Sequence, residues 1–206
     1  MSPFQKISVA LVISIMAGCS APSPSVELSP FTGDPWPEIR SERIATLLPN
    51  AMQDNEIDAW MVICRENNND PIADHVGCEN AGGTAAFMFF RTPDGLHTLA
   101  ISPAGEATSL AEKKMLDEVL EIERGLGIWG TVESQFERFQ PAKIGINTGN
   151  SPISDGLSHT QYASMTTGIS KKWTDRMVSA EPLIRSWLSV KLPVEVDIMR
   201  KAAEIT

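Results

Sequence analysis

Two kinds of hydrophobic pattern follow each other along this chain of 206 residues, and they predict alternating strands and helices. Runs of consecutive apolar residues are typical of strands covered on both faces, whereas apolar residues three and four positions apart are typical of helices with one buried side. The predicted strands are 59–64, 84–90, 96–101, 143–147 and 173–179. The predicted helices are 36–55, 106–115, 128–139, 158–165, 182–187 and a last one from 193 onward. Segment 119–122 fits either the end of a helix or a short strand.

Turn and capping signals arrange these elements. The sequence Arg-Thr-Pro-Asp-Gly at 91–95 predicts a tight turn, because Pro presets φ and Gly accepts positive φ, so the second and third strands should form an antiparallel hairpin. Pro49 should kink or divide the first helix. Ser158 and Gln161 have the spacing of a capping box at a helix start. We therefore expect a three-layer α/β domain on a mixed sheet that contains an antiparallel hairpin.

A polar loop follows the first strand, and its first residues are the densest group of functional side chains in the sequence. Arg65, Asn67, Asn68 and Asp70 come directly after the carboxyl end of a buried strand, which is the usual ligand-facing position in α/β sheets. Asn and Asp also favour turns, because their side chains bond to their own backbone. Both interpretations of the loop remain open.

The first residues predict an export signal rather than part of the fold. Lys6 precedes an apolar run, 7–17, that is too short to span a membrane as a mature helix. The run closes on Ala-Gly-Cys, which resembles the lipobox of bacterial lipoproteins. The resemblance implies a signal peptide at 1–18 and lipid on Cys19. An ordinary secretory signal with an incidental cysteine is the alternative.

Lipidation of Cys19 implies a place for the protein in the cell. Several acyl chains would anchor the chain firmly to the lipid bilayer. Ser20 stands where an Asp commonly retains such proteins at the inner membrane, so we expect an outer-membrane anchor facing the periplasm, in a Gram-negative cell. The segment 19–35 is rich in Pro and Ser and reads as a tether. The globular domain should span 36–190.

The net charge limits the classes of binding partner, and the cysteines raise the question of a disulfide. A net charge of −9 without a cluster of Lys or Arg argues against binding to nucleic acid. With Cys19 lipidated, Cys64 and Cys78 remain. An exported protein permits a disulfide between them, whereas buried free thiols are equally ordinary in an apolar strand. Both states of this pair remain open.

The sequence offers little catalytic chemistry of its own. The histidines His75, His97 and His159 lie far apart and lack the spacing of metal ligands. Asp70, Asp74 and His75 share one loop, but a solvated loop is favoured over a metal site. No phosphate-binding loop, dinucleotide fingerprint or nucleophile elbow is present. We expect no cofactor in this chain and no catalysis by the chain alone.

The order and spacing of six short segments nevertheless resemble a known family. These segments are Asp58–Ile63, Arg65–Pro71, Ile144–Asn147, Asp155–Leu157, Arg185–Glu195 and Met199–Ala203. Together they resemble the N-terminal, creatinase-type domain of Xaa-Pro aminopeptidases and prolidases, the pita-bread metallopeptidases. The resemblance spans about 36–206 and implies the ribonuclease H-like fold of the creatinase/prolidase N-terminal domain.

The same resemblance implies a function that lies mostly outside these residues. In the family, two divalent metal ions (manganese, cobalt or zinc) are held by two Asp, one His and two Glu of a catalytic domain, and no position here matches those ligands. The N-terminal domain helps the protein to oligomerise and restricts the mouth of the active site. By analogy, the loop of Arg65, Asn67, Asn68 and Asp70 would lie at that mouth, near proline-containing peptides.

The last helix favours the same interpretation. From Pro193 its apolar residues form one broad stripe, and no capping Gly, Asn or Pro follows them. We expect 191–206 to be the start of a catalytic domain that this chain lacks, so that the chain is an inactive accessory domain. A stand-alone periplasmic lipoprotein that binds peptides or another protein is the alternative.

Overall fold

The computed structural model describes residues 33–78 and 83–205. The chain divides into two units, 1–33 and 34–206, and every described helix and strand belongs to the second. The predicted signal peptide 1–18 and the predicted lipidation site Cys19 lie outside the described residues. Within the described part of the chain, no helix has the length and apolar character needed to cross a membrane.

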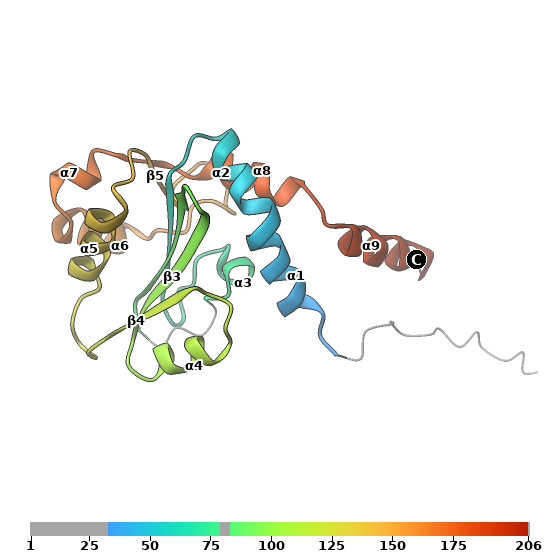
Figure 1. Ribbon diagram of the computed structural model, residues 1–206, viewed down its shortest axis with the longest axis horizontal. Coiled ribbons are helices and arrows are strands. Elements are labelled where there is room, and N and C mark those ends of the chain that lie inside the picture. The colour runs from blue at the N-terminus through green and yellow to red at the C-terminus, as the bar shows by residue number, and fades with distance from the viewer. Residues whose placement is uncertain (1–32, 79–82, 206) are drawn as a thin grey trace, which may run out of the picture. The chain divides into compact units, whose positions relative to one another are not determined.

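Helices and strands alternate along the second unit (Figure 1). The strands are β1 (Ala59–Cys64), β2 (Ala85–Thr92), β3 (Gly95–Pro103), β4 (Glu118–Ile122), β5 (Ile144–Ile146) and β6 (Met177–Ser179). The α-helices are α1 (Trp36–Glu42), α2 (Leu48–Asp54), α3 (Ala73–Val76), α4 (Glu106–Glu112), α5 (Trp129–Phe139), α6 (His159–Gly168), α7 (Lys171–Thr174), α8 (Glu181–Ser189) and α9 (Pro193–Ile205). A π-helical segment, η1 (Arg43–Leu47), connects α1 to α2.

The six strands form one mixed sheet in the order β4-β3-β2-β1-β5-β6. β2 pairs antiparallel with β1 and β3, whereas the pairs β3–β4, β1–β5 and β5–β6 are parallel. Every strand except β2 therefore points in one direction, so the carboxyl ends of five strands meet at one edge of the sheet. The predicted mixed sheet and its antiparallel hairpin, β2–β3, are confirmed.

Helices cover both faces of this sheet, as the run of buried residues in β1 predicts. Trp60 and Val62 pack into a core with α2 and α8, and Met61 and Ile63 pack into a second core with α5, α6 and α7. Figure 1 shows the same arrangement, with α5, α6 and α7 on one side of the strands and α2 and α8 on the other. The three-layer architecture is confirmed.

Pro49 explains the form of the first helical region. Pro has no N–H to donate to the carbonyl four residues earlier, and its ring crowds that turn. The helix widens just before it: the N–H of Leu48 donates to the carbonyl of Arg43, five residues back. The run from α1 to α2 is thus divided, as predicted, by a π segment rather than by a loop.

Three expectations need correction or completion. The polar loop predicted after the first strand is not all loop, because the short helix α3 lies within it. The predicted strand 173–179 was wrong in its first half: Trp173 belongs to α7 and is buried in the core from that helix, and only β6 is extended. The ambiguous segment 119–122 is a strand, since β4 pairs parallel with β3.

Helix α9 is confirmed as a helix but has no buried residue. The buried guanidinium of Arg43 ties its first turn to the domain. That group donates to Glu195 at 2.5 Å, to the carbonyl of Trp187 at 2.8 Å and to that of Val190 at 3.0 Å. Further along the helix, Met199 and Ile205 remain 57% and 66% exposed.

Candidate functional site

The loop after β1 begins with a tight turn at the carboxyl edge of the sheet. The N–H of Asn68 donates to the carbonyl of Arg65 at 3.0 Å, and Asn67 between them has φ of 59°. Asn adopts this left-handed conformation more readily than most residues. Asn67 thus belongs to a turn through its backbone, whereas the side-chain-to-backbone bond that the sequence offered as one interpretation is made by Asp70, which accepts from the N–H of Ile72.

Behind the turn, three buried side chains form a continuous hydrogen-bonded chain. Asp70 accepts from the N–H of Ile72 at 3.0 Å and from Nδ2 of Asn147 at 2.9 Å. Oδ1 of Asn147 accepts from the indole Nε1 of Trp60 at 2.7 Å. Asp70 and Asn147 are only 2% and 1% exposed, so each bond joins the loop rigidly to β1 and to the end of β5.

Gly156 packs directly against the carboxylate of Asp70, where no larger residue fits. A Cβ at Gly156 would lie 1.7 Å from Oδ2 of Asp70, far inside any real contact distance. The N–H groups of Gly156 and Leu157 donate to the carbonyl of Asn147 at 3.0 and 3.1 Å. The loop after β5 is therefore closed onto the loop after β1 at one point.

Burial changes the acidity of Asp70. Loss of solvent raises the pKa of its carboxyl to about 6, against the opposing hydrogen bonds from Ile72 and Asn147, and the nearby Asp155 raises it further. A carboxyl with such a pKa would suit proton transfer, but both oxygens are engaged inside the protein. We assign Asp70 a structural role in positioning the loop.

A groove opens in front of this network, with a cavity volume of about 390 Å³. Its side-chain lining comprises Arg65, Thr84, Pro103, Leu126, Ile128, Trp129, Thr160, Gln161 and Ser164. These residues come from the carboxyl ends of β1 and β3, the residue before β2, the segment after β4, and helices α5 and α6. The groove thus lies at the edge where open α/β sheets usually bind ligands.

The polar groups that line this groove are mostly neutral. Arg65 is the one charged residue among the described residues that line it. The Nε1 of Trp129 donates to Oγ of Ser164 at 2.8 Å, which fixes the indole on the α6 wall. The Oε1 of Gln161 accepts from the N–H of Ser158 at 3.0 Å and from Nδ2 of Asn68 at 3.3 Å. The predicted capping box is confirmed, and it also holds the loop after β1.

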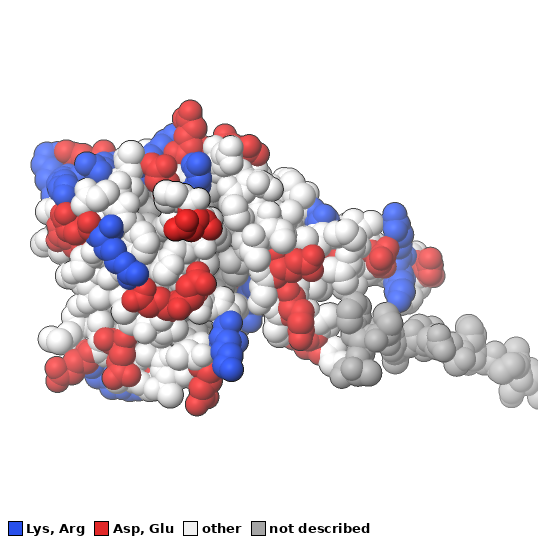
Figure 2. Space-filling model, viewed as in Figure 1, with Lys and Arg blue, Asp and Glu red and all other residues white. Residues whose placement is uncertain are grey.

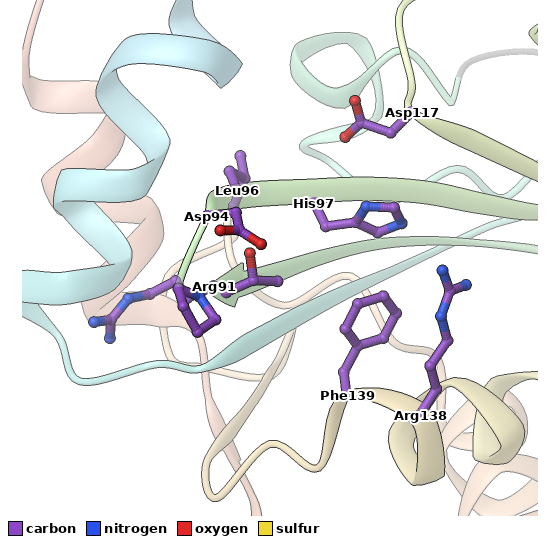
Figure 3. Close-up of a pocket in the computed structure, with 9 residues that line it drawn as sticks. Arg91, Asp94, Leu96, His97, Asp117, Arg138 and Phe139 are labelled. Atoms are coloured by element: carbon purple, nitrogen blue, oxygen red, sulfur yellow. The ribbon is translucent and has the colours of Figure 1, made fainter.

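A second hollow of about 550 Å³ lies at the opposite edge, around the β2–β3 turn (Figure 3). Here charges pair with one another. Glu118 accepts from Arg138 at 2.7 Å and lies 3.4 Å from Nε2 of His97, and Arg138 also stacks over Phe139. In Figure 3, Arg138 and Phe139 project from the end of α5 toward His97 on β3.

Asp117, which lines this hollow just before β4, has different surroundings. It accepts from both the N–H and the hydroxyl of Thr98 on β3, at 2.8 and 2.9 Å. The hydrogen bond from Arg138 is the main cause that lowers the pKa of Glu118. Arg138, one of the two arginines that line the hollow, is therefore already paired with Glu118.

Cys64 and Cys78 are joined by a disulfide, with their Cα atoms 6.1 Å apart. Both cysteines are buried, and the bridge ties the end of β1 to the residue pair that follows α3. The bond closes the segment 65–77, which carries the turn and Asp70. Of the two states that the sequence left open, the structure has the bridged one.

The histidines and acids of the described residues do not gather into a metal site. No group of three or more His, Cys, Asp or Glu in 33–78 and 83–205 is placed to hold a metal ion. His75 instead packs its ring 5.3 Å from Trp36 and 6.1 Å from Trp187, and burial lowers its pKa. The residues present do not fit the dinuclear metal centre that the family resemblance implies, and we route no chemistry through one.

The four loop residues singled out in the sequence have four separate positions. Arg65 lines the groove, Asn67 forms the turn, Asn68 bonds to Gln161, and Asp70 is buried in the network. Sequence reasoning missed Gln161 as a groove residue, because its capping position already accounted for it.

The face drawn in Figure 2 shows how charge is distributed over the same molecule. Acidic and basic side chains are interspersed there, without a continuous basic patch. On this face, therefore, no broad electrostatic surface competes with the two hollows as a candidate site.

The similarity of this chain to known proteins is found in its structure and not in its sequence. No protein-family model matches the sequence, and no curated protein matches it. The fold is similar to the Xaa-Pro dipeptidase from Bacillus anthracis, with a TM-score of 0.51 and 17% identity over 82% of this chain and 40% of that chain. It is equally similar to the X-Pro aminopeptidase from Thermotoga maritima MSB8, with a TM-score of 0.51 and 16% identity over 76% of this chain and 40% of that chain.

A separately solved Creatine_N superfamily domain of a dipeptidase from Streptococcus thermophilus aligns over 71% of this chain and 96% of that chain, with a TM-score of 0.47 and 14% identity. At these identities the two peptidase likenesses concern the fold. They confirm the predicted fold, a mixed α/β domain of the kind found in Xaa-Pro peptidases. This chain spans 40% of the length of each of those two peptidases.

Proposed function

We propose that this chain is the non-catalytic N-terminal domain of a Xaa-Pro aminopeptidase- or dipeptidase-like metallopeptidase, and that it is inactive alone. The observation that carries this proposal is the shared fold. Most of this chain aligns with two Xaa-Pro peptidases, and the alignment takes up 40% of each of them. The order of the short segments quoted from the sequence supports the same assignment.

In this proposal the chemistry belongs to a catalytic domain that follows α9. The two divalent metal ions of the family resemblance (manganese, cobalt or zinc) would be held there, by two Asp, one His and two Glu outside this chain, and would supply the chemistry at the bond before proline. This chain would contribute structure instead. Helix α9 supports that role, because it is fixed at its start by Arg43 and Glu195 and exposes Met199 and Ile205 further on. A domain packed on that stripe would bury them.

The domain would also act on access and assembly. We place the groove and the loop that begins at Arg65 toward the mouth of the active site, where they would limit the length of the peptide that enters. The rigid network of Asp70, Asn147 and Trp60 supports this placement, because a gate needs a fixed frame. Self-association of the domain belongs to the same proposal.

Two experiments test the peptidase assignment. Sequencing the gene past codon 206 should reveal, in some reading frame, a region that encodes two Asp, one His and two Glu in the family's order. The purified 206-residue chain, supplied with manganese, cobalt or zinc, should release no residue that precedes proline. An unrelated gene directly after codon 206 would contradict the assignment, and metal-dependent release by this chain would contradict its inactivity.

We further propose that lipid on Cys19 anchors the protein to the outer membrane, facing the periplasm. The support is the sequence alone: an apolar run that ends in two small residues before Cys19, then a Pro- and Ser-rich tether. Cells fed radiolabelled palmitate should label the wild-type protein and leave Cys19→Ala unlabelled. Equal labelling of both would overturn the anchor, and recovery of the wild type only from the inner membrane would overturn its location.

A stand-alone periplasmic module that binds peptides is the second candidate. The groove favours it, since the described residues that line it combine one arginine with neutral polar and apolar side chains. Calorimetry with proline-containing peptides and the gene sequence past codon 206 together distinguish the two candidates. Binding without any downstream catalytic region would support the module, and a downstream catalytic region would support the peptidase domain.

A further inference from the structure

The groove at the carboxyl edge holds a positive charge that nothing in the described structure neutralises. The side chain of Arg65 is exposed and has no ion pair or hydrogen bond with any residue of 33–78 or 83–205. The remaining described lining is uncharged. An arginine guanidinium matches a carboxylate with two parallel hydrogen bonds, and that pairing is stronger where the surroundings are apolar.

A second donor in the groove wall is also left over. Gln161 is 5% exposed, and its Nε2 has no hydrogen-bond partner within the described residues, although its Oε1 accepts two bonds. A buried donor without an acceptor costs about 1–3 kcal/mol, so an oxygen delivered by a ligand would be favoured there. This amide and the guanidinium of Arg65 belong to the same groove.

Helix α6 adds to the preference for an anion. It has ten residues, and Thr160 in its first turn lines the groove. The positive end of a helix dipole attracts negative groups. Within the described residues, a guanidinium without an ion pair, an amide donor without an acceptor and the first turn of α6 thus favour an anionic ligand that also carries a neutral oxygen.

The apolar walls and the size of the groove indicate what the anion is attached to. Pro103, Leu126, Ile128 and Trp129 line it, and Leu126 is 62% exposed. The volume of about 390 Å³ lies in the range of small-molecule sites, roughly 300–1,000 Å³, and greatly exceeds the size of an inorganic anion. The ligand should therefore be an apolar body with one carboxylate.

We propose that this groove binds the free C-terminal carboxylate of a short apolar peptide. The carboxylate pairs with Arg65 beside the first turn of α6, a peptide carbonyl accepts from Nε2 of Gln161, and the last side chain packs on Leu126 and Trp129. The inference deepens the proposed function, since it names the end of the peptide that this domain takes. It rests on that function only for the choice of a prolyl peptide as the probe.

The test is calorimetry of the full 206-residue chain in mild detergent with acetyl-Ala-Pro-Leu, as the free acid and as the C-terminal amide. We expect the acid to bind with Kd below about 1 mM and the amide at least tenfold more weakly. Arg65→Ala should weaken binding of the acid at least tenfold. Arg185→Ala, which removes the same charge from an exposed position on α8, should change Kd less than twofold.

Gln161→Glu provides the sharper variant. Glu suits the capping-box position as well as Gln, so α6 should form normally, but it replaces the donor with a second negative group. We expect at least a tenfold loss of binding with an unchanged helix content by circular dichroism. Absence of binding by the wild type, equal binding of acid and amide, equal competition by inorganic phosphate, or unaltered binding by Arg65→Ala would each overturn the inference. None of these results bears on the gene sequence past codon 206, which tests the peptidase assignment separately.

Discussion

The two edges of the sheet use polar side chains in opposite ways. At the carboxyl edge, Asp70, Asn147 and Trp60 are buried and hydrogen-bonded to each other, while Arg65 and Gln161 in front of them keep unused donors among the described residues. At the other edge, the charged groups around the β2–β3 turn pair on a partly exposed surface.

This difference shows why the two hollows should not be ranked by volume. The hollow around the β2–β3 turn is the larger, but its strongest charges already have partners, so a ligand would have to compete with them. The carboxyl-edge groove is smaller, and the donors of Arg65 and Gln161 in it have no partner among residues 33–78 and 83–205. A rigid frame with unused groups in front is the arrangement that binding sites require.

The largest effect should come from removing the space beside Asp70. Gly156→Ala would force a Cβ into its carboxylate, and we expect a loss of about 3 kcal/mol in the free energy of unfolding. Gly127→Ala is the matched control, because a Cβ there meets nothing within 4 Å. Urea denaturation measures both. Equal stability of the two variants would show that the carboxyl edge is not a tight frame.

A second effect should appear as a pH dependence. Because burial raises the pKa of Asp70 to about 6 from 3.8, the folded protein binds this proton more tightly than the unfolded chain. The contribution of the group to stability is therefore fully present below pH 4 and is lost as the pH rises through about 6. Asp70→Asn should lack this trend.

The measurement is the free energy of unfolding of wild type and Asp70→Asn between pH 4 and pH 7. Relative to the variant, the wild type should lose about 2 kcal/mol over that interval. A difference that stays constant with pH, or one in which the wild type gains stability, would contradict the buried and desolvated state of Asp70.

The smallest effect belongs to the other edge. Glu118→Gln removes the partner of Arg138 and His97, but its side chain is 30% exposed, so we expect a loss of only about 0.5 kcal/mol, which shrinks further in 1 M salt. Glu56→Gln, on a residue with an 86% exposed side chain, should have no measurable effect. A loss above about 2 kcal/mol for Glu118→Gln would remove the contrast between the edges.

The features predicted correctly from the sequence are those that depend on neighbouring residues. The capping box of Ser158 and Gln161 and the turn at 91–95 are read from neighbours within a few residues, and both occur as expected. The buried strand β1 was equally legible, because its apolar run admits few alternatives. Segment 173–179 failed, because an apolar Trp173 suits a buried helix turn as well as a strand.

The site itself depended on contacts between distant parts of the chain. Asp70 meets Asn147 across 77 positions, and Asn68 meets Gln161 across 93. Its place in a polar loop suggested that Asp70 faces solvent, whereas the fold buries it against Gly156. Only the parallel pairing of β1 with β5 brings these loops together, and periodicity does not reveal strand order.

The central claim is that ligand binding belongs to the carboxyl edge and not to the larger hollow. Amide and indole NMR spectra of the labelled chain, titrated with acetyl-Ala-Pro-Leu as the free acid, test it most directly. Shifts should concentrate on the indole N–H of Trp129, the side-chain amide of Gln161 and the backbone of Thr84, and spare His97 and Phe139. Shifts centred on His97 and Phe139, or no shifts at all, would contradict the account.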